Sequence, residues 1–179
     1  EKQISENGIE IYKLRKDKVN SINNQIKIIN KGDKYPFGIN LQIKDNYNYE
    51  DFDTKKYIKN LSGNRTLDAN YGGSKIGPHK SDITATINNK VDASQLSTGQ
   101  QKTLVLMILI AQCDYLISTE NIKPILLLDE ICSHLDHFNR DLLLDFSNQF
   151  DIQLFLTGTE KSMFSFMSTN TNFYNIMDQ

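Results

Sequence analysis

The sequence predicts an α/β protein with a parallel-sheet core in its C-terminal part and part of a mostly helical lobe before it. Two short apolar runs, 125–128 and 152–156, are separated by apolar residues at helical spacing. A strand, a helix and a second strand in this order are typical of a right-handed parallel crossover. The preceding residues are polar and rich in Asn and Lys. We therefore expect two partial lobes, a helical one over 1–75 and an α/β core over 76–179.

The first part contains one helix and one short strand by their patterns. Apolar residues recur every three or four positions, as on one face of a helix: Val19, Ile22, Ile26 and Ile29. After Pro36, apolar residues alternate as in a half-buried strand: Ile39, Leu41 and Ile43. No other element is predicted between there and residue 80.

The second part is more regular. Residues 83–87 and Val91 flank Asn88-Asn89, which predicts a hairpin, although Asn-Asn is a weaker turn signal than Asn-Gly. Residues 98–117 are apolar on nearly every side, as in a buried helix. The run 125–128 follows Pro124 and precedes two carboxylates, which suits a central strand covered on both faces.

Composition and charge narrow the classes of function. The chain has 179 residues and two cysteines, and its longest apolar run, 104–111, is less than half of a membrane span. We therefore expect a cytoplasmic protein that does not insert into membranes. Residues 1–90 carry a net charge of +5 and residues 91–179 one of −7, so the first half is suited to a polyanion.

The candidate contacts to DNA phosphates lie in the basic half. They are five basic residues in two groups: Lys13, Arg15, Lys16, Lys55 and Lys56. A solvated polar face explains the same residues equally well.

Asp129 and Glu130 follow the predicted strand 125–128 directly. Ligands of α/β proteins bind at the carboxyl ends of parallel strands, so we expect these side chains to lie at the ligand-binding edge of the sheet. In nucleotide hydrolysis one such carboxylate holds Mg²⁺ and the other positions the attacking water. The alternative is that the pair only ends a strand and caps the next helix.

A polar turn, Ser97-Thr98-Gly99-Gln100, lies at the start of the predicted buried helix. Ser97 with Gln100 three residues later predicts a capping box. The same turn offers a hydroxyl, amide N–H groups and the positive end of the helix dipole, which together suit a phosphate. Gly99 would let an anion approach the backbone closely.

Together these segments resemble those of ABC-type ATPases. The stretch 96–101 is similar to their signature motif, 125–130 to their Walker B strand, and Ser133-His134-Leu135-Asp136 to their D-loop. The spacing of Arg65, Asp68, Gly72-Gly73 and Gly77-Pro78-His79-Lys80-Ser81-Asp82 resembles the RecF family of bacterial DNA replication and recombination-repair proteins. The ending 155–159 also resembles that family, in which the switch histidine of transporters is absent.

The resemblance implies a role for each matching residue. Ser97, Thr98, Gly99 and Gln100 would contact the γ-phosphate of ATP held by the opposite protomer. Asp129 would support Mg²⁺ and Glu130 would be catalytic by positioning water. The D-loop residues would lie at the dimer interface: Ser133, Leu135 and Asp136.

The family further implies an ATP-dependent homodimer that binds single-stranded or gapped DNA. It also implies recombination-mediator partners, a weak DNA-dependent ATPase, and roles in recombinational repair and the SOS response.

The chain lacks one required motif. A phosphate-binding loop reads Gly-x-x-x-x-Gly-Lys-Ser/Thr, and none of the nine glycines here is followed by Lys. We therefore interpret the chain as the C-terminal portion of a RecF-type ATPase and expect negligible ATP turnover by it alone. The alternatives are another ABC-type head, such as an SMC-like one, and a nonfunctional remnant of a split gene.

Overall fold

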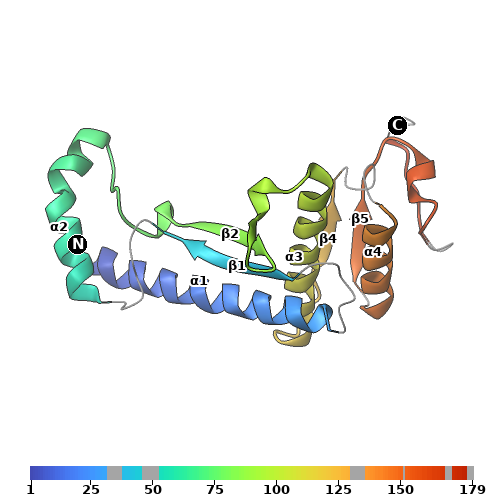
Figure 1. The fold of residues 1–179 in the computed structure, drawn as a ribbon, viewed down its shortest axis with the longest axis horizontal. Coiled ribbons are helices and arrows are strands. Elements are labelled where there is room, and N and C mark those ends of the chain that lie inside the picture. The colour runs from blue at the N-terminus through green and yellow to red at the C-terminus, as the bar shows by residue number, and fades with distance from the viewer. Residues whose placement is uncertain (32–37, 46–52, 130–135, 151, 168–170, 177–179) are drawn as a thin grey trace. The chain divides into compact units, whose positions relative to one another are not determined.

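The computed structural model describes residues 1–31, 38–45, 53–129, 136–150, 152–167 and 171–176 (Figure 1). These residues form two compact units, Glu1–Gln95 and Leu96–Gln179. Strand β2 (Asp82–Ile87) belongs to the first unit, where it pairs along its whole length with another strand. Helices and sheets occur in both units, so the α/β class is confirmed.

The first unit begins with helix α1 (Lys2–Ile29). Its apolar face is buried at Val19, Ile22 and Ile26, as the spacing predicts. The polar residue Asn23 is also buried on this side. Its side chain accepts a hydrogen bond from the Leu41 amide and donates one to the Leu41 carbonyl, both at 2.8 Å. One side chain thus ties the helix to the backbone of the neighbouring strand.

That strand, β1 (Ile39–Lys44), belongs to a three-stranded antiparallel sheet with the order β1-β2-β3. Strand β1 pairs with β2, with Ile39 opposite Ile87 at one end and Lys44 opposite Asp82 at the other. Strand β3 (Val91–Asp92) follows the predicted hairpin turn. Asn88 and Asn89 both have positive φ, at 50° and 55°, the left-handed conformation that short hairpin loops require. The hairpin is therefore confirmed.

Helix α2 (Thr54–Tyr71) is an element that the apolar pattern did not predict. The Asp53 carboxylate caps its first turn by accepting hydrogen bonds from two backbone amides, and Gly72 ends it with φ 72°. Tyr57 and Leu61 on α2 are buried in a small core with Ile9.

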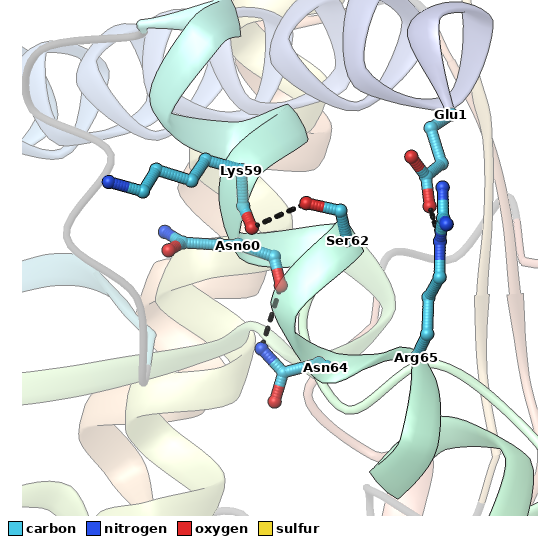
Figure 2. Close-up of polar contacts among 6 residues, drawn as sticks. All are labelled: Glu1, Lys59, Asn60, Ser62, Asn64 and Arg65. Carbon is cyan, nitrogen blue, oxygen red and sulfur yellow. Dashed lines mark hydrogen bonds and ion pairs between the residues drawn. The ribbon is translucent and has the colours of Figure 1, made fainter.

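Figure 2 shows polar contacts of α2, two within the helix and one with the start of the chain. Ser62 and Asn64 donate to carbonyls one turn back, and Arg65 Nε contacts Glu1 Oε1 at 2.6 Å. The hydrogen bond from Arg65 lowers the pKa of the Glu1 carboxyl, because it stabilises the charged form.

The second unit contains α3 (Thr98–Ser118), β4 (Ile125–Leu128), α4 (His137–Gln149) and β5 (Gln153–Leu156) (Figure 1). A short 3-10 helix, η4 (Lys161–Phe164), follows. Strands β4 and β5 pair in parallel, Ile125 opposite Gln153 and Leu128 opposite Leu156. The predicted parallel strand–helix–strand unit is therefore confirmed.

The two faces of this sheet differ. Leu126 and Leu128 are buried, whereas Ile125, Leu127 and Phe155 on the opposite face are 60%, 69% and 47% exposed. The expectation of a strand covered on both faces was therefore wrong for this chain. The apolar run does form a strand. None of the described residues covers the second face of the sheet.

Helix α3 also buries one side rather than all sides, and Val105 is about half exposed. By length and composition alone, α3 is long and apolar enough to cross a membrane, as core helices of globular domains often are. Of the helices in the described ranges, it is the one that passes this test.

Candidate functional site

The predicted signature turn opens α3. Ser97 is the N-cap: its Oγ accepts from the Gln100 amide at 3.4 Å, and Gln100 Oε1 accepts from the Ser97 amide at 3.1 Å. The predicted capping box is therefore confirmed. All four residues of the turn, 97–100, are exposed. A methyl group at Gly99 would meet no atom within 4 Å beyond its own helical turn. The backbone here is open to a ligand or to another chain.

Asp129 lies directly after β4, as expected from the sequence, and it is exposed. Its Oδ1 accepts a hydrogen bond of 2.5 Å from the hydroxyl of Thr157, which directly follows β5. The Thr157 amide in turn donates to the Leu128 carbonyl at 3.1 Å. Thr157 is therefore a neighbour of the predicted site that sequence reasoning missed. Parallel pairing brings the ends of β4 and β5 together, so the position after the second strand was the available signal.

Asp136 is the N-cap of α4, and its carboxylate accepts a hydrogen bond from the Asn139 amide at 2.8 Å. The other predicted D-loop residues, Ser133 and Leu135, and the predicted catalytic Glu130 lie outside the described residues.

A buried polar contact joins the starts of α3 and α4. Asn139 Nδ2 donates to Thr103 Oγ1 at 2.8 Å, and Thr103 Oγ1 donates to the Gly99 carbonyl at 3.1 Å. The structure thus connects the signature turn with the Asp136 cap through two side chains. Neither Thr103 nor Asn139 was predicted to matter.

The candidate DNA contacts lie in the first unit in two groups. Lys13, Arg15 and Lys16 are on α1, and Lys55 and Lys56 are in the first turn of α2. Arg15 has a structural partner, because its guanidinium donates to the Pro78 carbonyl and to Ser81 Oγ. Ser5 of α1 bonds to the Thr54 carbonyl, so the two groups are separated by about 12–16 Å along α1.

The described residues hold no group of three or more His, Cys, Asp or Glu side chains arranged to bind a metal. His79 instead bonds through Nε2 to the Ser74 carbonyl at 2.8 Å. Cys113 is buried, and burial raises the pKa of its thiol by disfavouring the charged thiolate. A raised pKa does not suit a nucleophile.

No family model matches the chain. It is 36% identical over 123 residues to the DNA replication and repair protein RecF of Allorhizobium ampelinum, a match that covers 68% of this chain and 33% of that protein. RecF of Rhizobium etli is 35% identical over 124 residues. The resemblance is to RecF. The chain spans about a third of the length of these curated relatives.

Solved RecF structures agree with this. A structure described as the recombination mediator protein RecF-ATP in the RecFOR pathway matches with a TM-score of 0.70 and 26% identity. The match covers 90% of this chain and 44% of that one. The predicted resemblance to part of RecF, with an α/β fold consistent with a partial ABC-type ATPase head, is therefore confirmed.

Proposed function

We propose that this chain forms the signature and Mg²⁺-side part of a RecF-type ATPase that binds DNA in recombinational repair and the SOS response. The observation that carries the proposal is the exposed turn at the start of α3, Ser97–Gln100, in a chain that is 36% identical to a RecF protein over 123 residues. Residues 76–179 are assigned to the ATPase core in this proposal, and residues 1–75 to part of the second lobe.

The turn suits the terminal phosphate of ATP held by an opposite protomer. The first amide groups of a helix have no partner within the helix, and the dipole places partial positive charge there. Gly99 leaves the approach open, and Ser97 and Thr98 add hydroxyl groups. ATP would then join two protomers, and Asp136, Ser133 and Leu135 would lie at the same interface.

In each composite site, Mg²⁺ would be held by the protomer that does not supply the signature turn. Asp129 presents an exposed carboxylate at the end of a parallel strand, and carboxylate oxygen is the ligand that Mg²⁺ prefers. When bound, the ion would neutralise charge on the phosphates. Glu130, the next residue, is proposed to hold the attacking water.

The basic first unit is the proposed DNA surface. Residues 1–90, which make up most of this unit, carry a net charge of +5, and this charge predicts binding that weakens steeply with salt, because cations bound to DNA are released. Lys13, Lys16, Lys55 and Lys56 are the proposed phosphate contacts. Arg15 is proposed to contribute less, since it is hydrogen-bonded within the protein. Recombination-mediator proteins remain proposed partners of the complete assembly, and the cytoplasm its proposed location.

Dimerisation tests the ATPase part of the proposal. We define the completed protein as this chain joined behind an N-terminal segment of RecF that carries a phosphate-binding loop. Sedimentation with and without ATP and Mg²⁺ should show a dimer only with nucleotide. Ser97→Arg should abolish the dimer by filling the phosphate position, and Glu130→Gln should stabilise it by preventing hydrolysis. Ser62→Arg, an equal change on an exposed position of α2, is the matched control.

The alternatives give different results. A completed protein that remains monomeric with ATP would favour a nonfunctional remnant. The 179-residue chain alone should show negligible ATP turnover. Turnover by this chain that Glu130→Gln abolishes would overturn the proposed division of the site. DNA binding that does not respond to salt would argue against the proposed DNA surface.

A further inference from the structure

Asn139 lies at a position where its side chain has no local structural task. It is the third residue of α4, where Asp136 already supplies the cap. It is 2% exposed, and its buried Oδ1 has no hydrogen-bond partner among the described residues, so its Nδ2 alone offsets the cost of burying the side chain. Its side-chain amide instead crosses to α3 and donates to Thr103 Oγ1 at 2.8 Å.

Thr103 extends the connection to the signature turn. It is 5% exposed, and its hydroxyl accepts from Asn139 while it donates to the Gly99 carbonyl at 3.1 Å. The single hydroxyl hydrogen and one lone pair are therefore both used. The backbone amide of Asn139 donates to the Asp136 carboxylate at 2.8 Å, so Asn139 contacts the α4 cap through its backbone and α3 through its side chain.

These hydrogen bonds lie at the starts of the two helices and differ in kind from the apolar burial further along them. Apolar side chains further along both helices are buried, among them Leu106 and Met107 on α3 and Leu143 and Phe146 on α4. Burial of apolar side chains is non-directional. A buried hydrogen bond is directional, and leaving one of its partners unpaired costs free energy. The start of α4 and the second turn of α3 are thus joined by a directional contact in addition to apolar burial.

We propose that Asn139 is a positioning residue that, through Thr103, fixes the signature turn relative to the Asp136 cap. This inference rests on the proposed function. The link would make the signature turn and the Asp136 cap, the two segments proposed to face the second protomer, move together. Loss of the link would leave both helices formed but free their first turns from each other.

Hydrogen exchange in the 179-residue chain tests the link without ATP or a second protomer. Thr103→Val keeps the shape and removes the hydroxyl, Thr103→Ser keeps the hydroxyl, and Asn139→Ala removes the donor. We expect Thr103→Val and Asn139→Ala each to speed exchange of the amides of residues 100–103 roughly fivefold. The double variant should add little beyond either single change, and Thr103→Ser should remain near the parent.

The controls separate positioning from general stability. Asn148→Ala changes an exposed Asn of the same helix and should leave residues 100–103 unchanged. The amides of β4 and of residues 110–118 should also be unchanged in every variant. Equal acceleration across the whole second unit, additive single effects, or no response at residues 100–103 would each overturn the proposal. A completed protein that fails to dimerise while this exchange pattern holds would count against the proposed function alone.

Discussion

Gly99 is a residue at which the requirements of folding can be tested separately from those of the proposed function. An added methyl group meets no atom within 4 Å outside its helical turn, so the folded chain itself does not require glycine there. Ala is also the better helix former by about 1 kcal/mol. If glycine is needed at this position, the reason is an approaching ligand or partner.

Gly99→Ala should therefore leave the melting temperature of the 179-residue chain unchanged or slightly raised. In the completed protein, it should weaken ATP-dependent dimerisation by about tenfold or more, because the methyl group occupies the space of the phosphate. Calorimetry and sedimentation measure the two effects. Gly63→Ala in α2 is the matched control, since that position is also helical and open, and it should not affect the dimer. A Gly99→Ala protein that dimerises normally would contradict the proposed phosphate contact.

At the scale of elements, the α1–α2 contact depends on close approach. A methyl group at Gly8 of α1 would lie 2.8 Å from Tyr57 Cε1, and Tyr57 is a buried side chain of α2. Gly is accepted in the second turn of α1 because the tyrosine ring lies against the backbone there.

Gly8→Ala should destabilise the chain by about 1–3 kcal/mol, as overpacking does, despite the higher helix propensity of Ala. Urea unfolding followed by circular dichroism gives the change in unfolding free energy. The same substitution at Gly63 should be neutral or stabilising. If both variants unfold at the same urea concentration, the ring does not pack on Gly8 as described.

The elements also show how far the sequence leads. The alternation in 39–43 and the Asn88-Asn89 turn were sufficient to predict β1 and the hairpin, since both signals are local. The pairing of β1 with β2 joins Ile39 to Ile87, and no local pattern encodes such a distant partner. Helix α2 was missed because it buries only Tyr57 and Leu61, too few apolar residues for a helical period; its signals were Asp53 and Gly72 at the two ends.

The candidate site divides in the same way. The capping box of Ser97 and Gln100 is local and was predicted from spacing. The contacts of Asp129 with Thr157 and of Asn139 with Thr103 join residues 28 and 36 positions apart. They depend on how strands and helices pack, which a single sequence does not specify.

At the scale of the whole molecule, the exposed face of the β4–β5 sheet is the main departure from an ordinary parallel sheet. Parallel sheets normally have both faces covered, and Ile125, Leu127 and Phe155 are exposed here. The matched RecF structure is more than twice as long, since this chain covers 44% of it. We expect further polypeptide of the RecF type to cover this face.

Leu127→Lys should leave the stability of the 179-residue chain nearly unchanged and reduce its self-association, because it replaces an exposed apolar side chain with a charge. In the completed protein, the same change should destabilise by several kcal/mol, because the charge would be buried. Light scattering and thermal unfolding measure these effects. Leu126→Lys, at the buried neighbouring position, should unfold both proteins. Equal tolerance of Leu127→Lys in both would show that the face remains uncovered.

A mixing experiment tests most directly whether the signature turn acts on ATP held by a second protomer. One completed protein carries Ser97→Arg, and the other carries a substitution of the lysine in its phosphate-binding loop. Each alone should fail to dimerise with ATP, because neither homodimer has an intact composite site. Their equimolar mixture should recover ATP-dependent dimers in sedimentation, since the heterodimer pairs an intact loop with an intact signature turn. No recovery on mixing, or normal dimerisation by the Ser97→Arg protein alone, would contradict the account.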